Sequence, residues 1–516
     1  MTLLKPIVVV AALLLALPQA ILAETARGQV YHDANANLRL DADERLLEGI
    51  AVSNGEQIVE TDSEGRYELD VSDDAIVFVI KPSGWRTPIN RQRLPQFYYI
   101  HKPAGSPKSK FAGVAPTGPL PKSIDFPLYP QKEPRQFKAI MFGDPQPRNQ
   151  KEIDYIAHDV VAELVGSDAA FGVTLGDIMF DDLSLFESSN STVALIGIPW
   201  YNVVGNHDIN REAKEDRHSD ETFERVFGPA YYSFDYGPVH FLVLDDIDWK
   251  LQQDGKTSYT GGFNETQLTF IKNDLSRVPN EKLVVLMMHI PLVNVSDRQE
   301  LYRLIEQRPF TMSISGHTHT HEHRYITLKD GWRGPKPHHH VINITVCGSW
   351  WSGEPDQKGI PHAMTSDGVP NGYSIITFDG SKYRLSYKAA RRPTDFQMNI
   401  VLPDSVRFSE VSSTELVANV FNATPNAAVK YQVNDGQWLE MKRDLRADPL
   451  LQRIIAEEAK IENKTWRNLS KPGPSRHIWV AKLAQLSEGT YSIRVRATEP
   501  DGTTYEGNQI LRVSGL

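Results

Sequence analysis

Residues 137–146 read "FKAIMFGDPQ", an apolar run that turns polar at Gly143. A short run of this kind predicts a buried β-strand. Asp144 and Gln146 follow directly, so both would lie just beyond the carboxyl end of that strand. In open α/β sheets ligands bind at this edge. The stretch therefore raises the question whether Asp144 begins a metal site or only an acidic turn.

The same pattern returns further along the chain. The runs "FGVTL", "WYNVV", "LVVLMM" and "TMSIS" end in "GD", "GNHD", "H" and "GHTH". Between the runs, stretches such as "IDYIAHDVVAELV" carry apolar residues at helical spacing. This alternation predicts a layered α/β domain with a partly parallel central sheet. One edge of the sheet would collect the side chains of Asp144, Gln146, Asp177, Asn206, His207, His289, His317 and His319.

These side chains suit a pair of divalent metal ions. Asp177 is a carboxylate that can bridge two ions, and mixed oxygen and imidazole ligands favour Mn, Fe, Zn or Co. Two ions roughly 3.5–4 Å apart can hold both ends of an in-line displacement at phosphorus. The glycines of the motifs are expected to let the backbone turn and to leave room for the ions.

The motif order D-x-Q, GD, GNHD, H and GHTH resembles that of the calcineurin-like metallophosphoesterases. The passage "CGSWWSGEPDQKGIPHAMTSDGVPNGYSIITFDG" at residues 347–380, with β-type segments on both sides of the core, is similar to an exported bacterial subgroup of that family. Many members have histidine at the position of Gln146. A neutral amide oxygen is a weaker ligand than imidazole, so the first site is expected to be looser or to prefer a harder ion.

The resemblance implies a role for each motif residue. His207 would contact the phosphate and protonate the leaving oxygen, with Asp208 orienting it. A hydroxide that bridges the two metals would attack phosphorus. The first metal would take Asp144, Gln146, Asp177 and His319, and the second would take Asp177, Asn206, His289 and His317.

Three functions are weighed on this basis. Hydrolysis of phosphomonoesters comes first, because an exported compartment favours scavenging of phosphate. A phosphodiesterase acting at the same site is the alternative. A non-catalytic surface or binding protein with a degenerate scaffold is the alternative of a different class, but every ligand position holds a competent side chain.

The first 23 residues predict a cleavable signal peptide. Lys5 precedes the apolar run "IVVVAALLLAL", and the small-residue end "ILA" closes at Ala23. A periplasmic or secreted protein is therefore expected. The run falls short of the ~20 residues that span a bilayer, so no membrane anchor is expected. The net charge of -10 argues against nucleic-acid binding. The family resemblance implies a small phosphate ester as the partner.

The mature chain divides by composition into a multidomain protein. Residues 24–128 predict an N-terminal β-sandwich, 129–136 a linker, 137–395 the catalytic α/β sandwich with mixed sheets, and 396–516 an immunoglobulin-like β domain. That last domain carries one helical insertion near "DPLLQRIIAEEAKI" and is expected to shape the entrance to the active site. The Pro- and Gly-rich passage at residues 102–134 is expected to strap along the catalytic domain, because its stretch "IDFPLYP" is apolar enough to pack.

A possible calcium loop lies in the N-terminal segment, at "DANANLRLDADE" (33–44). Leu38 stands where such loops favour glycine, and the alternative is a solvated acidic turn. The stretch resembles the small calcium-binding prealbumin-like β modules of secreted proteins. Positions 1, 3, 5, 7, 9 and 12 of a calcium loop, of which position 7 uses its backbone carbonyl, fall on Asp33, Asn35, Asn37, Arg39, Asp41 and Glu44.

Several further polar and aromatic residues invite assignment. In "HTHTHEH" (317–323) only the first two histidines fit the motif, and His321 and His323 are expected behind the ligands or at the surface. The run 338–340 predicts a polar cluster at the start of a strand. Trp350 is a possible substrate wall, because it follows Gly-Ser beyond a predicted strand end, whereas Trp351 is expected mainly to pack.

Overall fold

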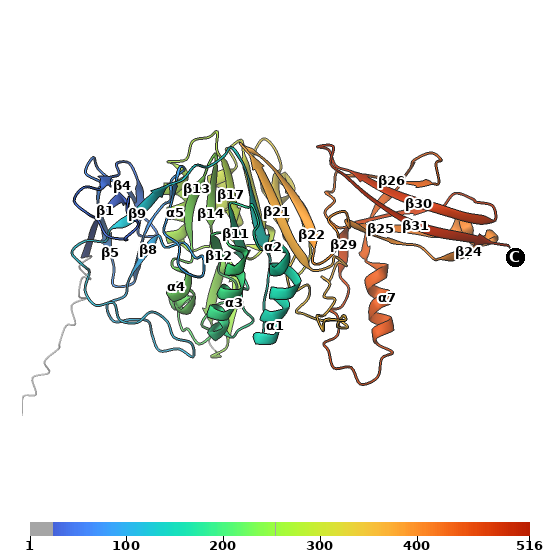
Figure 1. Ribbon diagram of the computed structural model, residues 1–516, viewed down its shortest axis with the longest axis horizontal. Coiled ribbons are helices and arrows are strands. Elements are labelled where there is room, and N and C mark those ends of the chain that lie inside the picture. The colour runs from blue at the N-terminus through green and yellow to red at the C-terminus, as the bar shows by residue number, and fades with distance from the viewer. Residues whose placement is uncertain (1–23, 253, 516) are drawn as a thin grey trace, which may run out of the picture.

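The computed structural model describes residues 24–252 and 254–515. The predicted signal peptide lies outside the described residues. Along the long axis of the molecule the chain forms an N-terminal β region, a central α/β region and a C-terminal β region, in sequence order (Figure 1). Within the described ranges no helix combines the length and the hydrophobicity that a membrane crossing requires.

The N-terminal region consists of two small sheets whose apolar side chains share one core. One has the order β2-β1-β9-β7, with β5 also paired to β1, and the other has the order β4-β3-β6-β8. Burial in β5 alternates residue by residue, as in any strand with one face toward a core. The prealbumin-like type stays a prediction. The strands are β1 (Glu24–His32), β2 (Arg45–Leu46), β3 (Ala51–Ser53), β4 (Ile58–Glu60), β5 (Arg66–Val71), β6 (Ala75–Val79), β7 (Trp85–Arg86), β8 (Tyr98–His101) and β9 (Phe126–Pro130).

Within the passage expected to strap along the catalytic domain, residues 102–134, the stretch "IDFPLYP" belongs to the N-terminal region. Most of it forms β9, which pairs in parallel with β1. Its side chains Phe126 and Leu128 are buried in the core beside the N-terminal sheets, and that burial ties the stretch to its own region. Residues 106–112 of the same passage do lie along the central region, as expected. There Arg225 donates a hydrogen bond to the carbonyl of Ala112 over 2.8 Å.

The central region contains two mixed sheets around a shared apolar core. Their orders are β12-β11-β10-β21-β22 and β13-β14-β17-β18-β20-β19. Phe137 and Phe378 of the first sheet pack against Phe241 of the second. The strands are β10 (Gln136–Phe142), β11 (Phe171–Leu175), β12 (Trp200–Val203), β13 (Tyr232–Tyr236), β14 (Val239–Val243), β17 (Leu283–Met287), β18 (Thr311–Ser315), β19 (Glu322–Ile326), β20 (His338–Ile342), β21 (Gly372–Asp379) and β22 (Lys382–Ala389), with the separate hairpin β15 (Ile247–Leu251) and β16 (Thr257–Gly261).

Within each sheet the strands that precede the polar motifs run parallel. β10, β11 and β12 are parallel neighbours, and so are β14, β17, β18 and β20. β11 and β17 are buried along their whole length, which explains their unbroken apolar sequences. The carboxyl ends of parallel strands point the same way, so this topology gathers the motifs.

Helices connect these strands. The side chain of Asn149 caps the first helix by accepting the backbone N–H of Glu152 over 3.1 Å. The α1 helix continues through a π turn at Ala157–Val161 into α2. The helices of the central region are α1 (Gln150–Ile156), α2 (Ala162–Leu164), α3 (Phe186–Val193), α4 (Glu221–Phe227), α5 (Glu265–Leu275) and α6 (Arg298–Ile305).

The C-terminal region pairs two sheets around a second core. The predicted helical insertion is α7 (Pro449–Glu458), which begins with a proline and is capped by Asp448. The immunoglobulin-like type stays a prediction, while the β-rich regions on both sides of an α/β core are confirmed. The strands are β23 (Met398–Val401), β24 (Ser405–Arg407), β25 (Glu415–Val420), β26 (Ala428–Val433), β27 (Leu439–Glu440), β28 (Lys442–Ala447), β29 (Pro474–Lys482), β30 (Gly489–Thr498) and β31 (Thr504–Ser514).

Buried polar side chains join the central and C-terminal regions. Asn422 Oδ1 accepts hydrogen bonds from Nε2 of His321 and of His323, each over 3.0 Å. The carboxylate of Asp367 accepts from His477 Nε2 over 3.0 Å. We call these five residues the interface cluster. Neither His321 nor His323 lies at the surface, because the C-terminal region covers them.

Candidate metal centre

The motifs after β10, β11, β12, β17 and β18 meet at one edge of the central region. All of their ligand-type side chains except His317 are buried, and His317 is half-buried. We call the seven ligand-type side chains the rim cluster: Asp144, Gln146, Asp177, Asn206, His289, His317 and His319.

Asp177 has contacts on two sides of the rim cluster. On one side, Gln146 Nε2 donates to Asp177 Oδ2 over 2.8 Å. The neighbouring pair there is Asp144 and His319, whose Oδ1 and Nε2 atoms are 3.7 Å apart. This side contains the four residues expected at the first metal.

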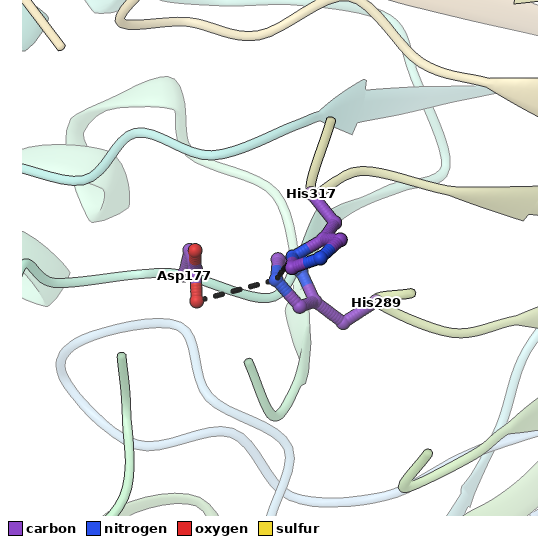
Figure 2. A group of neighbouring side chains, drawn as sticks. All are labelled: Asp177, His289 and His317. Atoms are coloured by element: carbon purple, nitrogen blue, oxygen red, sulfur yellow. Dashed lines mark hydrogen bonds and ion pairs between the residues drawn. The ribbon is translucent and has the colours of Figure 1, made fainter. Parts of the chain in front are cut away.

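On the other side, His289 Nε2 lies 3.3 Å from Asp177 Oδ1. The same nitrogen is 3.0 Å from Asn206 Oδ1 and 3.2 Å from His317 Nδ1. Figure 2 shows the rings of His289 and His317 close together and facing Asp177, and their ligand atoms all lie within 4.8 Å of one another. The carboxylate of Asp177 is therefore common to both groups of contacts.

Backbone carbonyls set the orientation of two histidine rings. His289 Nδ1 donates to the carbonyl of Leu175 over 2.8 Å, and His319 Nδ1 donates to the carbonyl of Gly348 over 2.6 Å. In each ring Nε2 therefore faces the carboxylates. Metal-binding histidines in proteins are typically held in this way through the nitrogen that does not bind the metal.

Five residues of the rim cluster have a left-handed backbone. The φ angle is 39° at Asp144, 45° at Gln146, 48° at Asp177, 75° at His317 and 51° at His319. Such conformations cost a non-glycine residue about 1–3 kcal/mol and persist where the surrounding fold enforces them. Their concentration at this edge indicates that the motifs tolerate a strained backbone in order to orient these side chains.

The motif glycines make room for ligand side chains, whereas the sequence suggested room for ions. A Cβ atom on Gly205 would collide with the Asp177 carboxylate, and one on Gly316 would collide with Asp144. Among the glycines of the four Gly-containing motifs, only Gly176 has a left-handed φ, at 83°. Close approach is therefore the main reason for glycine here.

Charges in the rim cluster strongly perturb its protonation. Burial raises the pKa of Asp144 to about 7, and the charge of Asp177 adds to the effect. Burial would lower the pKa of His289, but Asp177 and Asp144 outweigh it and raise that pKa to about 10. A proton on His289 therefore balances the Asp177 carboxylate. Binding of a cation through His289 Nε2 must release it, as expected for ligands that bind metals in deprotonated form.

His207 is oriented by Asp181 and not by Asp208 as predicted. His207 Nδ1 donates to Asp181 Oδ1 over 2.6 Å, and Arg211 Nη2 is also 2.6 Å from that oxygen. Burial would lower the pKa of His207, but Asp177 and Asp181 raise it. The side chain of Asp208 points elsewhere, because its oxygens are engaged by backbone groups.

Asp208 has a different role from the one expected. It is fully buried and joins the loop after β11 to the loop after β12. Its carboxylate therefore fixes the backbone that carries Asp177 and Asn206. The backbone N–H donors that it accepts, at 2.9–3.0 Å, belong to Ile178, Met179 and Gly205.

Two aromatic side chains flank the rim cluster. Trp350 is 36% exposed, and its ring centroid is 4.5 Å from that of His319. Phe180 stacks on His207 with ring centroids 4.6 Å apart. Trp351 is buried, and its Nε1 donates to the carbonyl of Pro145, which agrees with the packing role expected for it.

Sequence reasoning missed the part played by Asp181, Phe180 and Arg148. Asp181 is not among the ligand or catalytic residues expected from the motifs. Arg148 lies with its guanidinium 4.1 Å from the centre of the Phe180 ring. The sequence carries little indication of these roles. Asp181 lies in a loop after the GD motif, where the sequence does not fix the direction of its side chain. Arg148 and Phe180 are far apart in the sequence and meet only in the folded protein.

The predicted calcium loop is tightly wound by its own side chains. Asp33 accepts the N–H groups of Asn37 and Leu38 over 3.1 and 2.9 Å. Glu44 accepts the N–H of Ala34 over 2.8 Å, and so closes the loop from its other end. Leu38 has a φ of 64°, the left-handed conformation for which such loops favour glycine.

A second set of metal-type side chains lies between the N-terminal and central regions. It comprises Asp74, His218 and Glu221. Lys102 Nζ lies 2.9 Å from Asp74 and 2.6 Å from Glu221. This ammonium group already supplies the positive charge, so we assign no metal there.

Three family models match the chain. The N terminal of calcineurin-like phosphoesterase matches residues 34–114, calcineurin-like phosphoesterase matches residues 138–321, and the C terminal of calcineurin-like phosphoesterase matches residues 340–505. The search of curated proteins gave no match.

Two solved structures match the chain at low sequence identity. Purple acid phosphatase PPD1 from yellow lupin (Lupinus luteus) seeds is 13% identical, with 66% of each chain covered and a TM-score of 0.36. CopC from Methylosinus trichosporium OB3b is 14% identical, with 23% of this chain and 94% of that chain covered and a TM-score of 0.14. The assignment rests on the family models, which cover the N-terminal, central and C-terminal regions. That family implies a dinuclear metal centre. The chain belongs to the calcineurin-like phosphoesterases, with both the N-terminal and the C-terminal module of that family, and is a metal-dependent phosphoesterase.

Proposed function

We propose that the protein hydrolyses phosphomonoesters at the rim cluster with two divalent ions. Asp177 carries the proposal, because its carboxylate contacts both halves of the cluster. The first ion would be held by Asp144, Gln146, Asp177 and His319, and the second by Asp177, Asn206, His289 and His317. Donors of this mixed kind fit Mn, Fe, Zn or Co.

The fit of Gln146 depends on which way its amide points. The amide Nε2 donates to Asp177, while Oε1 lies 4.0 Å from Cys347 Sγ. Only the oxygen of an amide can bind a metal. A rotation of the amide by half a turn would present that oxygen, and the carboxylate of Asp177 would then be free for both ions.

Bound ions would polarise the phosphate oxygens and supply a nucleophile at neutral pH. The chain's own residues provide proton transfer and orientation. His207 donates through Nδ1 to Asp181, so Nε2 is the atom that can deliver a proton to the leaving oxygen. Phe180 covers one face of the imidazole and restricts its rotation.

The charge around His207 supports a monoester over a diester. A monoester carries up to two negative charges, whereas a diester carries one. The pKa of His207 is raised by Asp177 and Asp181, and Arg211 lies 3.1 Å from its ring nitrogen. With the charge of Asp177 taken up by bound ions, the His207 imidazolium and the Arg211 guanidinium would face the single carboxylate of Asp181, and the remaining positive charge suits the more highly charged substrate.

A metal analysis combined with a substrate comparison tests the proposal. The mature protein should bind two divalent ions per chain and hydrolyse p-nitrophenyl phosphate faster than bis(p-nitrophenyl) phosphate. The reverse preference would identify a phosphodiesterase. If no ion binds and neither ester turns over with Mn, Fe, Zn or Co added, the domain is a non-catalytic scaffold and the proposal fails.

We further propose that the protein acts in the periplasm or outside the cell. The support is the signal-peptide pattern of residues 1–23, which ends where β1 begins at Glu24. Fractionation of the producing cell followed by N-terminal sequencing tests this. Protein recovered from the cytoplasm with its first residues intact would contradict it.

We also propose that the loop at residues 33–44 binds calcium weakly. Its support is the ligand spacing together with the left-handed Leu38. The full chain is the right material for the test, because N-terminal and central side chains share one core. Calcium at a hundred times its Kd should raise the free energy of unfolding in the first transition by about 2.7 kcal/mol. Asp33→Asn should abolish that gain, and a gain that survives the substitution would place the calcium elsewhere.

A further inference from the structure

Arg148 lies at the rim between two aromatic side chains that flank the cluster. Its Nη1 donates to the carbonyl of Trp350 over 3.0 Å, and its guanidinium faces the Phe180 ring at 4.1 Å. The guanidinium is thus held by two residues that contact the site: Trp350, which neighbours the ligand His319, and Phe180, which neighbours His207.

Most donors of this guanidinium are free. A guanidinium has five N–H donors, and the bond to Trp350 uses one. Among residues 24–252 and 254–515, Nε and Nη2 of Arg148 have no hydrogen-bond partner. The nearby carboxylate of Glu152 is 3.7 Å from Nη1, and its oxygens already accept the Arg148 backbone N–H and Arg467 Nη1, each over 2.7 Å. The side chain of Arg148 is 20% exposed, so a ligand can reach it.

The C-terminal region adds a second arginine to this corner. Arg467, between α7 and β29, donates to Glu152 at the start of α1, and its carbonyl accepts the N–H of Gly353 over 2.8 Å. Glu152 is the one carboxylate between the two guanidinium groups, and Asp181, the other carboxylate near Arg148, is already paired with Arg211, so one positive charge is in excess. In a chain with a net charge of -10, such an excess beside the active site marks a place for an anion.

We propose that Arg148 binds a second anionic group on the alcohol part of the substrate. The preferred substrates would then be phosphate esters whose alcohol carries a carboxylate or a further phosphate. This inference rests on the proposed function, because it concerns the same site. A planar guanidinium already fixed by Phe180 and Trp350 can meet such a group with two parallel hydrogen bonds. Arg467 acts as a positioning residue, because it touches Glu152 and the Trp350 loop.

Matched substrate pairs test this inference with the metal-loaded full chain. Glycerol 3-phosphate and 3-phosphoglycerate differ only in the carboxylate of the alcohol part. Fructose 6-phosphate and fructose 1,6-bisphosphate differ in a second phosphate. The wild type should have a kcat/KM at least about tenfold higher for the more anionic member of one pair, and the pair that shows the effect identifies the anion.

Variants separate recognition from folding. Arg148→Ala should remove the preference through KM, so that kcat/KM falls about tenfold more for the anionic member of the pair than for glycerol 3-phosphate. Arg148→Lys keeps the charge but not the planar fork and should retain part of the preference. Arg467→Ala should lower the preference less than Arg148→Ala. Arg27→Ala, which removes an exposed arginine paired with Glu68 in the N-terminal region, is the matched control and should change nothing.

Three results would overturn the inference while the proposed function stands. The first is a wild type that hydrolyses both members of each pair equally well. The second is a preference that survives in both Arg148 variants. The third is a loss that is equal for neutral and anionic alcohols. A wild type that turns over none of these esters and no p-nitrophenyl phosphate would instead refute the proposed function itself, and the inference with it.

Discussion

The rim cluster and the interface cluster both take histidines from the stretch at residues 317–323, and the surroundings of those histidines differ. Burial lowers the pKa of His317 to about 3 and that of His321 also to about 3. Burial alone therefore does not separate the two. His317 lies with two buried carboxylates, Asp144 and Asp177, whereas His321 donates to the neutral amide of Asn422.

The two clusters differ in the number of their buried acids, and not in how well those acids are satisfied. Asp367, the acid of the interface cluster, accepts from Thr365, from His477 and from the backbone of His321. In the rim cluster, Asp177 accepts from Gln146 and from the backbone of His207 and pairs with His289 at 3.3 Å, and a second buried acid, Asp144, lies in the same cluster. The backbone of His317 is left-handed, whereas His323 lies in the regular strand β19. Paired acids on a strained backbone mark the candidate metal site, and the density of histidine does not.

The largest expected effect comes from removing the carboxylate that both halves of the rim cluster share. Asp177→Asn removes the charge shared by both halves, so it should lose both ions and reduce turnover to background. His321→Asn is the matched change at the interface and should keep both ions. Metal content measured beside turnover decides between them. If Asp177→Asn retained two ions, the shared-ligand assignment would be wrong.

Next in size is the loss of His207, a rim histidine outside the ligand set. His207→Ala should keep both ions and lower turnover by about 10²–10⁴-fold, with the largest loss for esters of poor leaving groups. Asp181→Asn should act in the same direction with a smaller loss, because it only orients the ring. Loss of metal in His207→Ala would show that the residue is a ligand after all.

Gln146 offers a milder test of the rim cluster. Gln146→Ala should weaken retention of the first ion and be partly rescued by excess metal, because an amide oxygen is a replaceable ligand. Gln146→His should bind metal at least as tightly and shift which ion gives the highest turnover. Titration of the metal-free variants with each ion provides the measurement. Full occupancy in Gln146→Ala would remove this residue from the ligand set.

The smallest expected effect is on the stability of the interface cluster at low pH. Burial lowers the pKa of His321 to about 3 and that of His323 to about 4, from an ordinary value near 6.5. The unfolded state therefore binds more protons than the folded state below about pH 6.5, and the stability of the interface should fall as pH drops from there toward 4. Unfolding midpoints of wild type and His323→Asn across pH 7 to 4 measure this. An equal acid dependence in both would contradict it.

Much of the fold and of the rim cluster was predictable from local pattern. Unbroken apolar runs such as 283–287 predict buried parallel strands, and the polar motifs follow those runs directly in the chain. The family assignment is confirmed by the models that match the core and both modules. The assignment of single residues to ions remains a prediction.

The family, the α/β core between β-rich regions and the residues at the strand ends follow from the sequence alone. Each of them depends on residues that are neighbours in the chain, and such neighbours stay together in the folded protein. Tertiary structure alone decided that Asp181 rather than Asp208 holds His207, and that Arg467 approaches Arg148. The direction of a side chain depends on its local backbone turn. Its partners depend on segments that are distant in the chain and meet only when the regions pack.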